Sequence, residues 1–547
     1  MYYQECERLA TEQPTLRPLI AEIDQRLHSL GPAAVLRDDE FAAIMKQPAD
    51  KVTGIFHELS RAGLLREERH AECPFCSMLN SLASYRKAVK DGDSFECSSC
   101  DQDMTRRKVS EVLIYRLNAS AMRVAAASPV STSAGAVSAG PGYGESLPQR
   151  VIDDPFRYTP LMRYYSQNST LGKAQPLARR RVVFVLHFLL DLIPFVEACR
   201  RLGLAMENAC FFFKEYPYPQ RGAIAALLKQ RGATVLPRSE ETAYLRQLVN
   251  SPKDRVDGTL LVEDGGFLVP AVHQQFTALL PLIKGAVEQT TRGARNDEQT
   301  GKAVGGLKLP VLSVAKSQLK NTFEPPYIAE ASIRNIRRLL PNLDLRGSSV
   351  AVLGYGAIGN QVAHSLRDGG AIVTVFDEAA ARQLEAGHEG FQVADTLRNA
   401  VSHKKLVIGA SGNRTVDAGA IAVLSHDCYV VSASSEQYEI DVDELNQQRI
   451  SMSDLKDDVG TPIGTSYVLP SDGRTVHLIA NGYPVNFWGS ESMPEPAADL
   501  IMSLILLSLV EVALGNYSKP GLDSDAVNKI ADKYKLSEKS LEFHNSR

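Results

Sequence analysis

The stretch "SSVAVLGYGAIGNQVAHSLRDGGAIVTVFD", residues 348–377, decides the fold of this chain. It has the pattern of a buried strand, a glycine-rich turn, a helix and a second strand. Gly354 permits the tight turn, Gly356 lets the backbone approach a pyrophosphate, and Gly359 lets the helix pack closely on the strand. Together with Ile358, these residues predict a dinucleotide site at the N-terminus of a helix.

An acidic residue completes this unit. Asp377 ends the second strand, at about the 20-residue distance from the turn that the dinucleotide motif requires. Its carboxylate would accept hydrogen bonds from ribose hydroxyls and would repel the 2′-phosphate of NADP, so the motif favours NAD. A Rossmann domain without nucleotide is the alternative that the glycines alone leave open.

Similar buried strands alternate with helical patterns after residue 150. Six runs are apolar on both faces, as parallel strands covered by helices are: "RRVVFVL", "GTLLVED", "SSVAVLG", "AIVTVFD", "KLVIGAS" and "CYVVSAS". The alternation predicts an α/β protein with two doubly wound, Rossmann-like domains. We expect a substrate-like domain over 151–327, completed by 487–547, and an NAD-binding domain over 328–486.

Length and composition are typical of a soluble globular protein. The chain has 547 residues, 44% of them hydrophobic and 23% charged, and its net charge of −4 gives no general attraction to nucleic acid or anionic membranes. The longest apolar run, "LIMSLILLSLVEVAL", is shorter than the roughly 20 residues of a membrane span, so we expect a buried helix. The opening residues lack a secretory signal, and most cysteines outside one cluster are scattered. We therefore expect a cytoplasmic protein.

The segment 38–68 has the pattern of two helices followed by a hairpin. Four apolar residues share one face of the second helix, namely Val52, Ile55, Phe56 and Leu59. The pattern resembles winged helix-turn-helix domains, so we expect such a domain over 1–69. Its role stays open between DNA binding and protein contact, because basic residues cluster only locally and the first 150 residues contain slightly more acids than bases.

Two Cys-x-x-Cys pairs follow this segment. "CPFC" and "CSSC" supply Cys73, Cys76, Cys97 and Cys100. Such pairs offer four thiolates in a tetrahedron, which is a closed structural zinc site. We expect a zinc ribbon over 70–108, with a redox dithiol or chance spacing as the alternatives. The run 125–148 is rich in Gly, Pro, Ser and Ala, which predicts a flexible linker.

Several stretches around the glycine turn resemble the S-adenosylhomocysteine hydrolase family. They are "LVEDGGFLVP", "GAVEQTTRG", "SVAKSQLKN", "GASGN", "EID" and "LIANGYPVN", in the family's order. The resemblance begins near Pro155 and implies a tightly held NAD in a two-domain subunit of an oligomer. It also implies transient oxidation of a ribose 3′-hydroxyl by NAD, which acidifies the C4′ hydrogen, lets homocysteine leave and is reversed within the same turnover.

The family's cofactor contacts are largely present. Besides the glycine turn and Asp377, the resemblance assigns NAD contacts to Thr290, Thr291, Asn321, Asn413 and Asn486. One departure is Arg292, where the family has a third threonine. This many polar matches favour a real NAD pocket over glycines that serve the fold alone.

The substrate side departs further from the family. The resemblance assigns catalytic roles to Lys316, His187 and Asp264, with a structural or NAD-proximal role as the alternative for Lys316. Other reacting groups of the family are replaced, by Leu189, Gln289, Lys320, Ser435 and Met493. Lys320 would place a second cation in the site of Lys316 unless a substrate anion lies between them. Ordinary hydrolysis of adenosylhomocysteine is therefore not expected.

Two functions remain open. The favoured one is a regulator or sensor, in which NAD or a nucleotide sets the shape of the hydrolase-like body and the N-terminal module contacts DNA or a protein partner. The alternative is an NAD-dependent enzyme that uses 3′-oxidation on a nucleoside or nucleotide other than adenosylhomocysteine, with Lys320 and Arg292 as anion contacts. Both predict bound NAD, and we expect structural zinc and a homo-oligomer.

Overall fold

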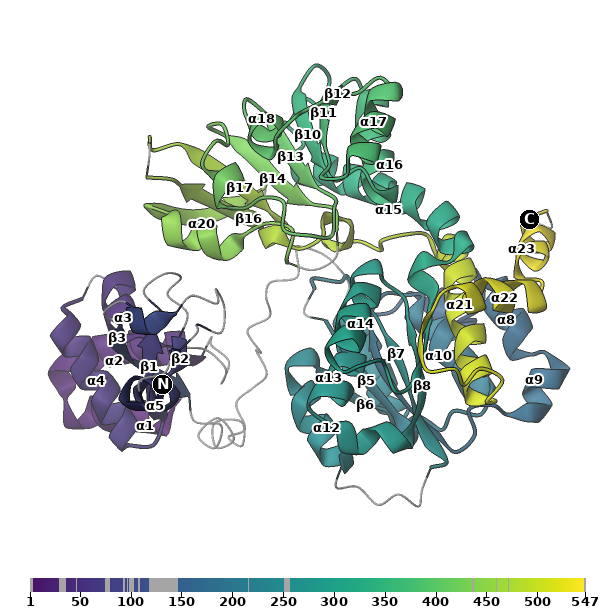
Figure 1. Cartoon of the computed structure of the whole chain (residues 1–547), viewed down its shortest axis with the longest axis horizontal. Coiled ribbons are helices and arrows are strands. Elements are labelled where there is room, and N and C mark those ends of the chain that lie inside the picture. The colour runs from purple at the N-terminus through teal and green to yellow at the C-terminus, as the bar shows by residue number, and fades with distance from the viewer. Residues whose placement is uncertain are drawn as a thin grey trace. The chain divides into compact units, whose positions relative to one another are not determined.

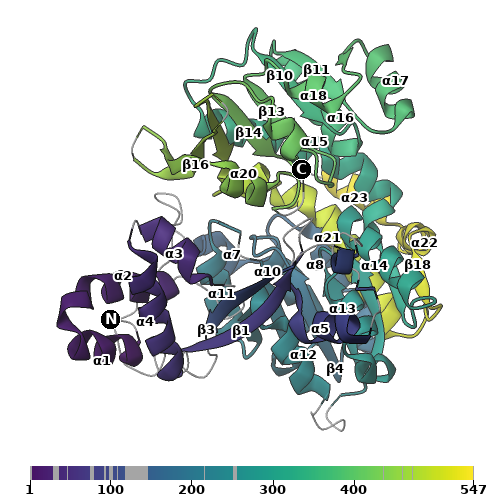
Figure 2. The same ribbon diagram turned by 60° about the vertical axis from the view of Figure 1, so that its left-hand side comes forward.

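The computed structural model divides the chain into two compact units, Met1–Ala134 and Gly135–Arg547. It describes residues 3–28, 36–45, 47–73, 79–91, 94–95, 97, 103–106, 109–117, 146–214, 216–249, 256–434, 437–458, 460–470 and 472–545. The predicted linker at 125–148 lies outside these residues, apart from its last three. Figures 1 and 2 show the elements of each unit.

The first unit combines helices with one three-stranded sheet. Its elements are α1 (Gln4–Glu12), α2 (Arg17–His28), α3 (Asp38–Met45), α4 (Ala49–Arg61), β1 (Leu65–Glu72), β2 (Leu79–Ser81), α5 (Leu82–Asp91) and β3 (Ser110–Leu117). The amphipathic face of α4 is buried, with Phe56 packed edge-on against Phe41 and Tyr115. The sheet order is β2-β1-β3, and β1 runs antiparallel to both neighbours. In the sequence, the four cysteines all fall after β1 and before β3.

The second unit begins with a seven-stranded sheet whose paired strands are all parallel, in the order β18-β9-β8-β7-β4-β5-β6. Its elements are α7 (Gln149–Asp153), α8 (Pro160–Ser166), α9 (Ser169–Ala174), β4 (Arg180–Leu186), α10 (Leu192–Arg201), β5 (Ala209–Phe213), α11 (Arg221–Gln230), β6 (Thr234–Pro237), α12 (Glu241–Val249), β7 (Gly258–Glu263), α13 (Leu268–Gln274), β8 (Ile283–Glu288), α14 (Thr291–Ala303) and β9 (Pro310–Ser313). After the second sheet, the chain returns to this one with α21 (Glu495–Ala513), β18 (Gly521–Asp523), α22 (Asp525–Lys533) and α23 (Leu536–Asn545).

The long helix α15 (Gln318–Leu339) leads into an eight-stranded sheet of order β12-β11-β10-β13-β14-β17-β16-β15. Its elements are β10 (Ser349–Leu353), α16 (Ala357–Asp368), β11 (Ile372–Phe376), α17 (Ala380–His388), β12 (Gln392–Val393), α18 (Leu397–Val401), β13 (Leu406–Gly409), α19 (Ala418–Ile421), β14 (Cys428–Ser432), α20 (Val442–Gln448), β15 (Ser451–Lys456), β16 (Pro462–Val468) and β17 (Thr475–Ile479). Neighbouring strands pair in parallel along β12-β11-β10-β13-β14-β17. At the far edge, β16 runs antiparallel to both β17 and β15.

Each large sheet is buried on both faces. In β4, Val182 and Phe184 join the core on one face, and Val183 and Val185 join the core on the other. All six apolar runs of the sequence form strands, because residues that must be buried on two sides leave no polar face for solvent. The predicted α/β class with parallel sheets is confirmed.

The apolar run near the C-terminus forms α21, which packs into the core of the first sheet. Among the described residues, this helix is the one that could cross a membrane by length and composition, and 89% of its most apolar window is buried inside the protein. Leu504, Ile505, Leu506 and Leu507 are fully buried in the same core as β4. The helix is therefore a core element of this fold.

Candidate functional site

A cavity of about 300 Å³ lies at the carboxyl ends of the strands of the first sheet. Its wall includes His187 after β4, Asp264 after β7 and Gln289 after β8. The glycine turn of the second sheet adds Gly356 and Ile358 to the same wall. Ligands of open α/β proteins bind at this edge, because the loops that follow parallel strands converge there.

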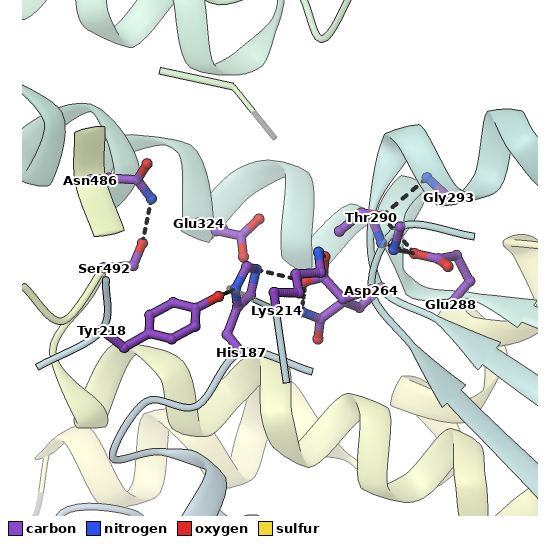
Figure 3. Close-up of polar contacts among 12 residues, drawn as sticks. His187, Lys214, Tyr218, Asp264, Glu288, Thr290, Gly293, Glu324, Asn486 and Ser492 are labelled. Carbon is purple, nitrogen blue, oxygen red and sulfur yellow. Dashed lines mark hydrogen bonds and ion pairs between the residues drawn. The ribbon is translucent and has the colours of Figure 1, made fainter. Parts of the chain in front are cut away.

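Asp264 forms the charged centre of this wall (Figure 3). The carboxylate is 1% exposed and contacts Lys214 Nζ, His187 Nε2 at 3.0 Å, and the Gln289 side-chain amide. Burial alone would raise the pKa of Asp264, but the charges and hydrogen bonds of His187 and Lys214 hold it well below its usual range. Asp264 is therefore a buried, fully ionised acceptor.

His187 is fixed by contacts on both ring nitrogens. Its Nδ1 meets the Tyr218 hydroxyl, its Nε2 faces Asp264, and its ring stacks on Phe487 with 4.2 Å between centroids. A carboxylate only accepts, so Nε2–H donates to Asp264. Nδ1 accepts from Tyr218 when the ring is neutral and donates to it when the ring is charged. Tyr218, His187 and Asp264 thus form a linear chain of hydrogen bonds. This chain can bind a proton at His187, in the cavity wall.

The glycine turn has the close approaches that the motif requires. Gly354 has φ +98°, and a Cβ there would lie 2.7 Å from the backbone of Ser411. A Cβ on Gly359 would overlap the carbonyl oxygen of Gly354. Gly356 begins α16 without a side-chain cap, so the amides of the first turn are left for a phosphate.

Asp377 lies beside this turn. Its Oδ2 accepts from the amide of Tyr355 at 2.6 Å, and its Oδ1 accepts from the amide of Ala379 at 2.8 Å. The carboxylate is thus held against the turn at the end of β11. This is the position from which the motif's acidic residue binds a ribose.

Asn486 provides a buried polar atom without a partner. The residue is 2% exposed, and its Nδ2 donates to Ser492 Oγ at 2.8 Å. Its Oδ1 is buried and has no hydrogen-bond partner among the described residues. Asn486 lines the cavity, so this acceptor fits a ligand N–H such as that of the nicotinamide carboxamide.

Glu439 organises the loop that follows β13. This fully buried carboxylate accepts from the amides of Ser411 and Gly412 and from the hydroxyls of Ser411, Thr415 and Ser434. Ser411, Gly412 and Ser434 line the cavity. The shared "EID" stretch therefore supports the cofactor side of the site from behind.

The structure separates the two lysines that the sequence placed in one site. Lys316 Nζ pairs with Glu298 at 2.7 Å on the surface and lines a second cavity together with Asn321. Lys320 is 8% exposed, pairs with Glu324 at 2.5 Å and lines the first cavity. Each cation therefore has its own carboxylate partner.

The other predicted residues divide among three places. The first cavity is lined by Gly356, Ile358, Thr290, Thr291 and Asn486. The glycine turn is shaped by Gly354, Gly359 and Asp377. The second cavity is lined by Asn321 together with Thr291 and Gly356, and the Asn413 side chain accepts from Arg295 at 2.9 Å. Leu189, Gln289, Arg292 and Met493 line the first cavity as well. Ser435 lies outside the described residues.

Two further acids lie at the cavity: Asp191 lines it, and Glu491 contacts the backbone of Leu190 beside it. Burial raises the pKa of Asp191 to about 7, with the charge of Glu495 adding to the effect. Burial also raises the pKa of Glu491 to about 8, with Asp191 as the next cause, although the amide of Leu190 donates to Glu491 at 3.0 Å. These two carboxyl groups therefore hold protons near neutral pH.

Sequence reasoning missed Lys214, Tyr218, Asp191 and Glu491. Lys214 directly follows the buried strand β5, and Tyr218 lies just beyond it in "KEYPYP". A charged residue at the carboxyl end of a buried parallel strand is the signal that could have identified Lys214. The two acids lie in loops, where no comparable pattern marks them.

The cysteines are described only in part. Cys73 and Cys97 are both buried and belong to one small cluster with Ala71, Leu82 and Met104. Cys76 and Cys100 lie outside the described residues. The zinc ribbon and the winged helix stay predictions.

Comparison with known proteins gives one consistent result. Residues 328–492 match the family profile "S-adenosyl-L-homocysteine hydrolase, NAD binding domain". Adenosylhomocysteinase of Thermotoga maritima is 30% identical over 55% of this chain and 73% of its own length, and S-inosyl-L-homocysteine hydrolase of Methanopyrus kandleri is 30% identical over 60% and 75%. Among solved structures, a dipicolinate synthase chain of Bacillus halodurans covers 61% of this chain and 98% of its own at 13% identity and a TM-score of 0.35. The family profile and the two relatives confirm the predicted NAD-binding domain.

Proposed function

Since this chain belongs to the adenosylhomocysteinase family, we propose that it is an NAD-dependent enzyme acting on a purine nucleoside or nucleotide other than adenosylhomocysteine. The observation that carries the proposal is the buried His187–Asp264–Lys214 centre, which opens on the same cavity as the glycine turn. Burying such charges costs free energy that apolar residues of similar volume would avoid. A catalytic role would explain why the fold retains these buried charges despite that cost.

NAD bound at the turn would supply a hydride acceptor for a ribose carbon. The hydroxyl on that carbon would give its proton to His187, whose imidazolium form is stabilised by Asp264. The proton would enter at Nδ1, the nitrogen that Tyr218 occupies, so Tyr218 relays it or gives way to the substrate hydroxyl. Lys214 and the Gln289 amide keep Asp264 ionised throughout.

The substrate class follows from the remaining wall. Lys320, held by Glu324, brings a cation into the cavity where the family has an acid, and Arg292 adds a second cationic side chain. Leu189 and Met493 make another part of the wall apolar. A ligand with a flat base and an anionic or strongly polar group suits this combination.

Purified protein tests this proposal in two stages. Denaturation followed by mass spectrometry should release NAD, and S-inosyl- or S-adenosylhomocysteine, nucleosides and nucleotides are then added while absorbance is followed at about 340 nm. Reduction of bound NAD by a compound other than S-adenosylhomocysteine in the native protein, and no reduction by it in Asp264→Asn, supports the proposal. If the purified protein contains NAD but none of these compounds reduces that NAD, the proposed enzymatic function is wrong.

The second candidate is the regulator or sensor, in which the N-terminal unit contacts DNA or a protein partner. It is favoured by the division of the chain into two compact units and by the burial of Cys73 and Cys97 in one cluster. We propose a winged helix with a structural zinc at the four cysteines. DNA binding whose affinity changes with NAD would support the regulator. NAD reduction by a substrate, with DNA binding unaffected by NAD, would instead support the enzyme.

We also propose that the body forms a homo-oligomer, as the family resemblance implies. Light scattering after gel filtration measures the mass directly. A strict monomer would contradict this proposal while leaving the catalytic one intact.

A further inference from the structure

A second charged cluster adjoins residues of the cavity wall along the chain and has no part in the chemistry proposed above. Glu263 ends β7, Glu288 ends β8, and Asp297 lies in the middle of α14. All three are 0% exposed, and one oxygen from each lies within 4.8 Å of the others. Three carboxylates this close and this dry require a compensating positive charge or protons.

Backbone amides hold the two glutamates in place. Glu263 Oε2 accepts from Phe267 and Leu268 at 2.7 Å each, and Oε1 accepts from Val269 at 3.1 Å. Since a carboxylate offers about four lone-pair positions, roughly one is left on Glu263 Oε1. The first turn of α13 thus fixes the orientation of this carboxylate and leaves one acceptor position unused.

Glu288 is held in the same way from the other side. Its Oε1 accepts from the amide and hydroxyl of Thr290 at 2.6 Å each and from the amide of Gly265 at 3.2 Å. Its Oε2 accepts from the amide of Gly266 at 2.9 Å. The backbone of α14 approaches so closely that a Cβ on Gly293 would overlap the Glu288 carboxylate (Figure 3). Four donors thus match the roughly four lone-pair positions of the Glu288 carboxylate, but three of them crowd Oε1 and only one reaches Oε2.

Asp297 differs from both glutamates. Neither of its oxygens has a hydrogen-bond partner among the described residues, although both are buried. An unpartnered carboxylate at this depth, directed at two others, points to a ligand that completes the cluster.

We propose that Glu263, Glu288 and Asp297 bind one small hard divalent cation of the Mg²⁺, Mn²⁺ or Ca²⁺ class. Oxygen ligands lie about 2.0–2.6 Å from such ions, so ligand oxygens around one ion are separated by roughly 3–5 Å, which matches the spacing here. All ligands are hard carboxylate oxygens, which these ions prefer over softer metals. The ion neutralises two of the three charges and gives Asp297 its missing partner.

The location gives this ion a structural role in the site above it. Glu263 precedes Asp264, and Glu288 precedes Gln289 and Thr290, so the cluster ties together the two strand ends that carry the cavity wall. An ion there would fix the separation of β7 and β8 at the point where Asp264 and Gln289 touch. The proposal stands independently of which substrate the cavity accepts.

The test uses the full chain and the metals alone. Elemental analysis should find about one equivalent of Mg²⁺, Mn²⁺ or Ca²⁺ per chain, with zinc counted separately because of the cysteines. After chelation, the effective ion at 100 times its Kd should raise the folded-to-unfolded ratio about 100-fold in thermal unfolding, and K⁺ should not.

The variant Asp297→Asn removes one ligand while keeping its shape, and Glu298→Gln is the matched control on the exposed side of the same helix. Asp297→Asn should weaken binding more than about tenfold, and the control should bind as the native chain does. Native protein without a divalent ion and without a thermal shift would overturn the proposal even if the variant failed to fold. Unchanged binding by a folded Asp297→Asn would overturn it as well.

Discussion

The buried Lys214–Asp264 pair and the exposed Lys316–Glu298 pair offer a direct comparison of two lysine–carboxylate contacts in one protein. The side chains of the first pair are 3% and 2% exposed, and those of the second are 46% and 42% exposed. Replacing either lysine with methionine removes one cation and keeps a similar chain length. The two variants therefore differ mainly in the surroundings of the carboxylate that is left behind.

The expected magnitudes are far apart. Lys214→Met leaves Asp264 buried with one charged partner fewer, and breaking a buried pair costs about 3–5 kcal/mol. His187 and the Gln289 amide remain in contact with Asp264, so we expect the lower end, about 3 kcal/mol. Lys316→Met breaks an exposed pair, which is worth about 0–1 kcal/mol.

Urea unfolding measures both values, with Trp488 as the probe. It is the only tryptophan of the chain and packs against the core of the second sheet, so its fluorescence reports the second unit. The double variant Lys214→Met/Asp264→Asn should recover most of the loss, because it removes both charges. Equal losses for the two single variants, or a loss below about 1 kcal/mol for Lys214→Met, would refute a buried, mutually dependent charge centre.

Three further predictions concern other parts of the chain. The fold raises the pKa of Asp191 to about 7 and of Glu491 to about 8, so both groups lose protons on unfolding above about pH 4, and stability should fall as the pH rises toward 8. The free energy of unfolding of Glu491→Gln should therefore rise relative to that of the native chain by about 1.4 kcal/mol for each pH unit between about pH 5 and 8. A difference in unfolding free energy that stays constant in urea titrations over this range would contradict the prediction. Gly359→Ala places a Cβ against the Gly354 carbonyl, so the variant should lose bound NAD in mass spectrometry of the denatured protein, and full retention would speak against the turn as the binding site. Metal analysis of Cys97→Ser should show loss of one zinc per chain, and an unchanged zinc content would exclude the four-cysteine site.

The sequence was sufficient for the strands and the glycine turn. A parallel strand buried on both faces must be apolar throughout, so runs such as "RRVVFVL" identify themselves by composition. The turn is equally constrained, because Gly354 and Gly359 are placed where any Cβ would meet backbone atoms. Features of this kind depend on local backbone geometry, which sequence spacing records.

The chemistry of the cavity was harder to predict, because it depends on residues distant in the chain. Lys214 meets Asp264 only because β5 and β7 lie on either side of β4 in the sheet order. Lys316 and Lys320 are four residues apart, yet the start of α15 turns them to different cavities and different acids. Neither outcome leaves a periodic signal in the sequence.

Reduction of bound NAD by substrate tests the central claim most directly. Purified chain with its NAD is mixed with S-inosyl-L-homocysteine, S-adenosyl-L-homocysteine or a candidate nucleotide, and absorbance at about 340 nm is followed over a single turnover. The account predicts a rise in the native chain with S-inosyl-L-homocysteine or a candidate nucleotide rather than with S-adenosyl-L-homocysteine alone, and no rise in Asp264→Asn that carries the same amount of NAD. A rise of the same size and rate in Asp264→Asn, or no rise with any compound in native chain that holds NAD, would contradict it.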